Sequence, residues 1–256
     1  MKNDPFTAGS LSEALAGSGL SDVRFFPSCA STNDEAKRMF AEGQSAPALL
    51  AAAEQTAGRG RMGRQFLSPA GSGVYFSLLY PLSAPPASVL YATCASGVAV
   101  RRAILSATGR DTRIKWVNDL RFAGRKVCGI LTEAVSLGDR HALVIGVGIN
   151  LRPVAFPPEL AGIAGSLEDT DCPRATLVAA CAGELLRILR APEGAWLAAY
   201  RAASCTLGQE VRILRDGALL WRGTAVDIRP DGALLLRLAD GSILPVTTGE
   251  VSLREQ

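Results

Sequence analysis

The sequence predicts an α+β fold, in which a larger domain on a central mixed β-sheet with grouped helices is followed by a small β-barrel. Apolar residues make up 48% and charged residues 20% of the 256 positions, which is ordinary composition for a folded globular chain. Strand-like runs stand together with helices grouped between them, as in α+β domains. After Leu207 the pattern changes to short alternating strands joined by Asp-Gly pairs, which are strong hairpin signals. We therefore expect a loose N-terminal segment over 1–22, the larger domain over 23–204 and the barrel over 205–256.

Local signals place the elements of the larger domain. Ser31 or Thr32 is suited to cap the first long helix, which Gly43 ends. Residues 73–100 carry no charge, but three prolines at 81, 85 and 86 divide them into a strand and a buried helix rather than a membrane span. The expected strands cover residues 23–28, 48–55, 73–80, 112–116, 126–135 and 141–151, and the expected helices cover 33–43, 86–105, 174–190 and 196–203. In the barrel, strands are expected at 210–216, 218–229, 232–240 and 242–246.

Charge and cysteine content exclude several classes of protein. The net charge of +3 is too small to indicate a nucleic-acid partner by itself. The six cysteines form no CxxC pair, and with His141 as the single histidine there is no zinc-ligand pattern. The first 20 residues contain no apolar core of signal-peptide length, so we expect a cytoplasmic protein that does not associate with membranes.

Residues 58–63, GRGRMG, match the GxGxxG pattern of dinucleotide-binding folds. That interpretation fits badly, because no helix follows directly and no acidic residue occurs before Asp111 to bind a ribose. The better interpretation is an anion site, since Arg59, Arg61 and Arg64 alternate with residues that let phosphate approach the backbone amides. A solvated basic loop is the alternative.

Three further segments carry weaker signals. In KWVND, residues 115–119, a lysine ends a strand and an Asn-Asp pair follows, which is commonly only turn chemistry. In KVCGIL, residues 126–131, a lysine opens an otherwise apolar strand. In GVGIN, residues 146–150, two glycines stand in a strand, where glycine often marks the close approach of a ligand.

Five segments, taken in order, resemble the motif set of the biotin protein ligase family, with matching spacing over residues 25–150. They are Ser31-Thr32-Asn33, Gln55 through Arg64, KWVNDL, KVCGIL and GVGINL. The small terminal β-barrel is also similar to that family's last domain. The resemblance implies a class II synthetase-like ligase domain that uses ATP and magnesium to form biotinyl-5'-AMP from biotin. It further implies transfer of biotin to a lysine of a biotin carboxyl carrier protein, such as the carrier domain of acetyl-CoA carboxylase, and it leaves a homodimer open.

The resemblance also implies roles for single residues. Those implied to surround biotin are Ser31, Thr32, Asn33, Gln55, Arg59, Gly60, Arg61, Lys126 and Gly129. Those implied to bind ATP or the adenylate are Arg59, Arg61, Arg64, Phe66, Lys115, Asn118 and Asn150. Those implied to act in catalysis are Lys126, Arg61 and Asp119, and those implied to hold magnesium are Asp119 and Asn150. A carboxylate at Asp119 is suited to take a proton from the incoming lysine amine.

Three positions depart from the family's pattern. Val117 stands where proline is usual, Phe66 where tryptophan is usual, and Cys128 where glycine or alanine is common. None of the three removes a charged or hydrogen-bonding group. Phe66 keeps a ring that could stack on adenine.

Two alternative functions remain. A lipoate or octanoate attachment enzyme is expected to show an RRxSGGG-like stretch, where this chain has GRGRMGR and the KWVND segment. A biotin-sensing transcriptional regulator is expected to carry an added DNA-binding domain. Only 24 residues precede Phe25, fewer than the roughly 50 that an independent domain needs, so we expect no specific DNA binding.

Overall fold

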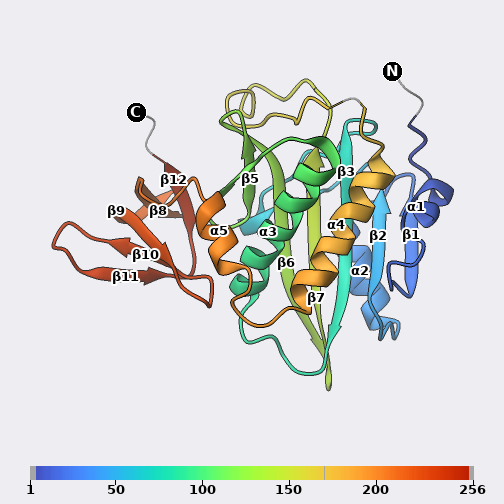
Figure 1. Ribbon diagram of the computed structural model, residues 1–256, viewed down its shortest axis with the longest axis horizontal. Helices are drawn as coiled ribbons and strands as arrows, with labels where there is room; N and C mark the ends of the chain where they lie inside the picture. The colour runs from blue at the N-terminus through green and yellow to red at the C-terminus, as the bar shows by residue number, and fades with distance from the viewer. Residues whose placement is uncertain (1–3, 170, 254–256) are drawn as a thin grey trace.

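The computed structural model describes residues 4–169 and 171–253, and a seven-stranded mixed β-sheet forms its centre (Figure 1). The strand order is β1-β2-β3-β7-β6-β5-β4; β1 and β2 are parallel, and all other neighbours are antiparallel. The strands are β1 (Asp22–Phe26), β2 (Ala48–Ala52), β3 (Gly73–Leu82), β4 (Arg113–Lys115), β5 (Asp119–Phe122), β6 (Arg125–Leu137) and β7 (Arg140–Asn150). All five residues of β2 are buried, which explains its uninterrupted apolar sequence. The predicted mixed sheet is confirmed.

Helices cover both faces of this sheet. The long helices α3 (Val89–Thr108) and α4 (Arg174–Leu189) pack against each other on one face, whereas α2 (Thr32–Ala41) lies on the opposite face (Figure 1). Helix α3 begins after Ser88, whose hydroxyl accepts a hydrogen bond from the Tyr91 amide, and it ends at Gly109 with a left-handed φ of 70°. The uncharged stretch of sequence is therefore a strand and a buried helix, as predicted. None of the described helices is both long and apolar enough to cross a bilayer.

After α5 (Leu197–Ala203) the chain forms a five-stranded antiparallel sheet in the order β11-β10-β9-β8-β12. Its strands are β8 (Glu210–Arg215), β9 (Ala218–Ile228), β10 (Leu234–Arg237), β11 (Ile243–Val246) and β12 (Glu250–Leu253). The predicted all-β part is present, but its closure into a barrel is wrong, since β11 and β12 are edges that do not pair with each other within the described residues. The buried side chains of this sheet, such as Ile213 and Leu236, join the same apolar core as α3 and α4, so one face is covered without closure.

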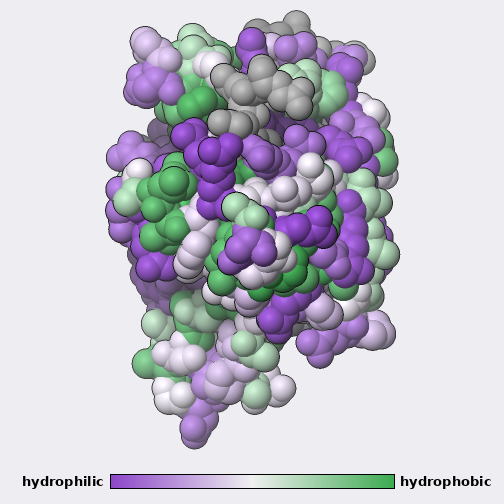
Figure 2. Space-filling view, turned by 90° about the vertical axis from the view of Figure 1, so that its left-hand side faces the viewer, coloured by the Kyte–Doolittle hydropathy of each residue, from purple (hydrophilic) through white to green (hydrophobic). Residues whose placement is uncertain are grey.

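The second sheet projects from one end of the molecule, and the two termini lie at opposite ends (Figure 1). Viewed from the side of this sheet, the surface is a mosaic of hydrophilic and hydrophobic residues (Figure 2).

The expectation of a loose N-terminal segment is wrong for its described part, residues 4–22. Helix α1 (Ala8–Ala14) starts with a capping box between Thr7 and Ser10, and its Leu11 is fully buried. Asp4 accepts hydrogen bonds from Arg152 at 2.5 Å and from Arg174 Nε at 2.9 Å. These contacts tie the segment to the end of β7 and the start of α4. A seven-residue helix gives too little periodicity to be recognised in sequence.

Two strands were not expected. The turn predicted at Asn118-Asp119 is present, but the chain then forms the four-residue strand β5, which pairs with β4 and β6. Strand β12 pairs with β8 near the C-terminal end. Both strands are short, so neither shows enough alternation to stand out from the surrounding turns.

Candidate active site

A cavity of about 270 Å³ lies on the α2 face of the large sheet, under the glycine-rich loop. It is lined from five directions: the start of α2, the loop around Arg59 to Leu67, strands β5 to β7, the connection around 156–164, and the chain at Gly249 to Val251 of the second sheet. All of the site residues suggested by sequence line this one cavity: Ser31, Thr32, Asn33, Gln55, Arg59, Gly60, Arg61, Arg64, Phe66, Lys115, Asn118, Asp119, Lys126, Gly129 and Asn150. These predicted residues, from Ser31 to Asn150, lie up to 119 positions apart in the chain and meet at one place.

Thr32 and Gln55 form a neutral polar end of the cavity. Gln55 Oε1 accepts hydrogen bonds from the Thr32 amide at 2.8 Å and from the Thr32 hydroxyl at 3.1 Å, while Gln55 Nε2 donates to Ser68 Oγ at 3.0 Å. Asn33 is 4% exposed, and its amide donates to Glu133 Oε2 at 2.7 Å. Neutral amides and hydroxyls in fixed orientations suit a neutral polar ligand with both donors and acceptors.

The floor of the cavity is a pair of glycines on neighbouring strands. Gly129 of β6 and Gly148 of β7 are directly opposite each other in the sheet. A methyl group added at Gly148 would lie 2.4 Å from Phe66 Cε1, and one at Gly129 would lie 3.1 Å from Phe66 Cε2. The Phe66 ring therefore packs where side chains at these positions would project, which makes this part of the cavity flat and apolar.

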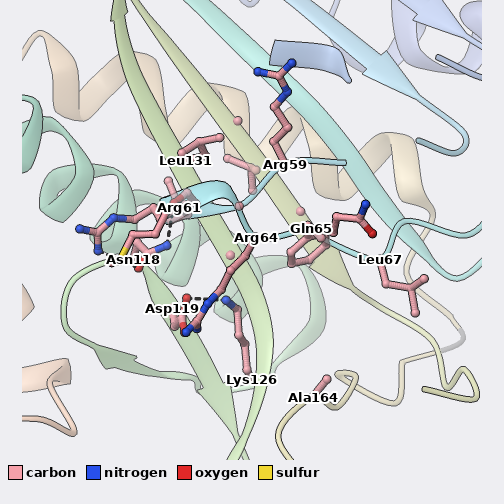
Figure 3. A pocket seen from close by; sticks show the side chains of 18 of the residues that line it. Arg59, Arg61, Arg64, Gln65, Leu67, Asn118, Asp119, Lys126, Leu131 and Ala164 are labelled. Carbon is pink, nitrogen blue, oxygen red and sulfur yellow. Dashed lines mark hydrogen bonds and ion pairs between the residues drawn. The ribbon is translucent and has the colours of Figure 1, made fainter. Parts of the chain in front are cut away.

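The three arginines of the glycine-rich loop point in different directions (Figure 3). Arg59 pairs with Asp34 of α2 at 2.9 Å. Arg64 pairs with Glu250 of β12 through two hydrogen bonds, one of 2.8 Å and one shorter. Arg61 turns inward, where its guanidinium donates to Asn118 Oδ1 at 3.4 Å, and burial lowers its pKa although nearby Asp119 opposes this shift. Arg61 is therefore the loop cation that faces the cavity from inside.

The other end of the cavity is cationic. Lys126 Nζ lies 2.7 Å from Asp119 Oδ1, as the dashed line in Figure 3 shows. Burial lowers the pKa of Lys115, and the Asp119 charge partly offsets that effect. Arg61, Arg64, Lys115 and Lys126 line this end together with the carboxylates of Asp119 and Glu250, so it has excess positive charge suited to an anion.

Asn118 and Asn150 are held by the backbone. Asn118 Nδ2 donates to the Ile130 carbonyl at 2.9 Å, and Asn150 Nδ2 donates to the Gly165 carbonyl at 3.0 Å. These bonds fix the amides so that the carbonyl oxygen of Asn118 is directed at Arg61.

Sequence reasoning missed several residues of the site. Glu250 and its neighbours come from a strand that was not expected, and Phe156, Leu160 and Ile163 come from a connection without regular structure. No local sequence pattern identified these residues, because only the tertiary structure brings them to the cavity. His141 lies in the hairpin of β6 and β7, where it bonds Ser136, and it does not line the cavity.

Comparison with known proteins agrees with this architecture. Residues 25–150 match the Biotin/lipoate A/B protein ligase family, and residues 206–254 match the Biotin protein ligase C terminal domain. The biotin--[acetyl-CoA-carboxylase] ligase of Mycobacterium tuberculosis is 32% identical over 96% of this chain and 95% of that protein. The chain belongs to the biotin protein ligase family.

Solved structures of the family show the same fold. The biotin protein ligase of Aquifex aeolicus, solved in complex with biotin and ATP, has a TM-score of 0.78 and 27% identity, covering 93% of this chain and 100% of that one. The bifunctional ligase/repressor BirA of Bacillus subtilis is 44% identical over 46% of this chain, but the match spans only 38% of its own length. Both family models thus match parts of this chain, whereas the match to the Bacillus protein leaves much of that protein's length uncovered.

Proposed function

We propose that this chain is a biotin protein ligase, which forms biotinyl-5'-AMP from biotin and ATP and transfers biotin to a lysine of a biotin carrier protein. The observation that carries this proposal is the polarity of the single cavity, with a neutral hydrogen-bonding end at Thr32 and Gln55 and a cationic end at Arg61, Lys115 and Lys126. Biotin has the same polarity, with a neutral ureido ring at one end and a carboxylate at the other. The family relationship supports the proposal.

In the first step, a carboxylate oxygen of biotin attacks the α-phosphorus of ATP, and pyrophosphate leaves. The carboxylate is already ionised at neutral pH, so no general base is required. The residues of the cavity bring two anions together and neutralise their charge. Lys126 is placed to exchange its Asp119 partner for the reacting carboxylate and phosphate, while Arg61 covers them from the loop.

Magnesium fits this end of the cavity with help from the nucleotide. Asp119 offers a carboxylate and Asn150 a carbonyl oxygen, and Mg²⁺ is usually held by one or two such protein ligands together with phosphate oxygens and water. When bound, the ion would neutralise charge on the phosphates. The described residues contain no cluster of three or more acidic, histidine or cysteine ligands, so the protein alone offers no complete metal cage.

In the second step, the acceptor lysine attacks the carbonyl carbon of the mixed anhydride and AMP leaves. The amine must lose a proton to be nucleophilic, and Asp119 is the carboxylate that lines this end of the cavity.

We assign this chemistry to residues 23–204, with Gly249 to Val251 adding part of the wall. A reducing cytoplasmic setting is supported by the six cysteines, all of which are free. We propose that the chain acts without specific DNA recognition; its described N-terminal residues pack on α4. A homodimer is tested by sedimentation of the purified protein.

The test is incubation of the purified protein with radiolabelled biotin, ATP, magnesium and a biotin carrier domain, in parallel with radiolabelled lipoate and its acceptor domain. Label transferred from biotin to the carrier, lost when ATP or the acceptor lysine is removed, is the expected result. Transfer of lipoate with no transfer of biotin would instead place the chain among the lipoate-attaching members of the matched family.

A further inference from the structure

A buried chain of hydrogen bonds runs from Glu133 on β6 to Thr32 in the cavity wall. Glu133 Oε2 accepts from Asn33 Nδ2 at 2.7 Å. Ser77 of β3 is fully buried, and its hydroxyl oxygen lies 2.6 Å from Asn33 Oδ1 and 2.8 Å from Thr32 Oγ1. Gly146 leaves room for this chain, because a methyl group there would lie 2.1 Å from Asn33 Oδ1. Four side chains from the three elements α2, β3 and β6 are thus linked in one line.

The direction of the chain is fixed at the Glu133 end. An ionised carboxylate can only accept hydrogen bonds, so the amino group of Asn33, and not its carbonyl oxygen, must face Glu133. The other oxygen of Glu133 accepts a hydrogen bond from Lys37 Nζ at 3.0 Å. Asn33 Oδ1 therefore faces Ser77, and since a carbonyl oxygen cannot donate, the one proton of the Ser77 hydroxyl is committed to Asn33.

This commitment determines what Thr32 can offer a ligand. The Ser77 proton is used, so the 2.8 Å contact between the two hydroxyl oxygens is favourable only if Thr32 supplies its own proton. The one other acceptor close to Thr32 Oγ1 is Gln55 Oε1, at 3.1 Å, which already accepts the Thr32 amide. Both acceptors lie inside the network. Toward the cavity the Thr32 hydroxyl presents lone pairs alone.

We propose that Glu133 and Ser77 are positioning residues that fix the Thr32 hydroxyl as an acceptor, so that the cavity selects a ligand with an N–H donor at this point. The inference rests on the proposed function, in which the ureido ring of biotin supplies that N–H. Glu133 and Ser77 do not line the cavity, so they act through Asn33 and Thr32. Glu133 and Ser77 therefore make the cavity favour a ligand with an N–H donor over one with an acceptor at the same position.

The experiment compares the binding of biotin with that of its two cyclic carbamate analogues, in each of which one ureido N–H is replaced by oxygen. For each protein, calorimetry gives the dissociation constant of each carbamate divided by that of biotin. Desthiobiotin is the control ligand, because it keeps both ureido N–H groups. In the wild type, the carbamate whose oxygen faces Thr32 should bind about 10- to 100-fold more weakly than biotin, because two lone pairs then oppose each other in a buried site.

Glu133→Gln lets the Asn33 amide turn over, and Ser77→Ala breaks the chain in the middle. Either change removes Ser77 as an acceptor of the Thr32 proton and leaves Gln55 Oε1, 3.1 Å away and already bonded to the Thr32 amide, as the acceptor that remains in the network. The Thr32 proton can then also point into the cavity, and the preference for biotin over that carbamate should fall by about 5-fold or more. In each variant, the affinity for desthiobiotin should change by the same factor as the affinity for biotin. Lys37→Met is the matched control, since it removes the other partner of Glu133 but leaves the carboxylate and the chain, and it should keep the wild-type ratio.

Thermal melting of each variant reports folding, and the ratio of dissociation constants cancels a general loss of affinity. A ratio that stays within twofold of wild type in both Glu133→Gln and Ser77→Ala would overturn the inference while leaving the proposed function intact. Absence of any biotin binding by the wild type would overturn both.

Discussion

Lys126 and Asp119 form a close ion pair at the cationic end of the cavity, with nitrogen and oxygen 2.7 Å apart. A lysine at the start of an apolar strand could also be explained by a packed stem and an ammonium that reaches water. The pair shows that the ammonium is turned toward the cavity, where it meets the carboxylate that also faces Arg61 and Lys115. Lys126 is therefore available to the anions that enter.

We expect Lys126→Met to slow biotin-dependent pyrophosphate exchange on the order of 100-fold or more, because one preorganised charge is lost from the reacting groups. Lys126→Arg should not restore the full rate, since a planar guanidinium cannot occupy the position of a compact ammonium. Thermal melting serves as the folding control. Near wild-type exchange by the methionine variant would show that Lys126 is only a surface lysine with no role in forming the adenylate.

The paired glycines of β6 and β7 show how an element can shape a site by leaving out side chains. Gly129 and Gly148 are opposite each other, and Phe66 fills the space above them. The ring was expected to stack on adenine; in the structure it packs on the sheet and borders on Tyr75 with ring centres 6.5 Å apart.

A methyl group at Gly148 conflicts with the Phe66 ring at 2.4 Å, so Gly148→Ala should destabilise the protein by about 1–3 kcal/mol through overpacking. In a Phe66→Ala background the same change should cost close to nothing. Urea unfolding of the two single variants and the double variant gives the coupling free energy directly. Additive effects would mean that Phe66 does not occupy this position in solution.

The glycine-rich loop is fastened by ion pairs whose arginines are more than half exposed, with 54% of the Arg59 side chain and 65% of the Arg64 side chain accessible. Exposed pairs of this kind contribute little free energy, typically about 0–1 kcal/mol. The loop can therefore open readily when no anion lies beneath Arg61. A bound adenylate would add contacts that an empty cavity lacks.

We accordingly expect trypsin to cleave after Arg59, Arg61 and Arg64 in the free protein and to do so about 10-fold more slowly with biotin and ATP present, as a small gain in loop stability lowers the open population. ATP alone and biotin alone are the matched controls. Equal cleavage rates under all conditions would rule out a loop that closes over the ligands.

The two ends of the chain are both fastened to the central sheet. At the C-terminal end, Trp116 Nε1 donates to the Gly232 carbonyl at 3.0 Å, and Glu250 holds the loop through Arg64. At the N-terminal end, Asp4 is 10% exposed and bridges Arg152 and Arg174. Burial alone would raise the pKa of Asp4, but its hydrogen bonds from Arg152 and Arg174 outweigh this and lower it. The carboxylate thus stabilises the fold in its ionised form.

Asp4→Asn should lower the free energy of unfolding at pH 7 by about 1–3 kcal/mol, the range for a hydrogen bond to a charged group. Because the folded pKa is lowered, the stabilisation is present above the unfolded value of about 3.9 and is lost as the pH falls through the folded pKa. The difference in melting temperature between wild type and variant should therefore shrink below about pH 4. Asp22→Asn, which loses only the exposed pair with Arg24, should show little difference at either pH.

Much of this protein could be predicted from its sequence, because the signals that specify its helices, strands and turns lie within short segments. Apolar runs, prolines and Asp-Gly turns act over a few residues, so they located most strands and helices. The site residues could be named because each stands in a short segment whose order resembles a known family, and all of them line the cavity.

Other features depend on contacts between residues that are far apart in the chain. The bond between Arg64 and Glu250 spans 186 positions, and that between Asn33 and Glu133 spans 100. Such partners have no fixed spacing, so only the tertiary structure could show that Asn33 is engaged internally, that Glu250 holds the loop and that residues 4–22 are packed. The open second sheet has the same cause: its apolar strands were evident in sequence, but what covers them is decided by the larger domain against which they pack.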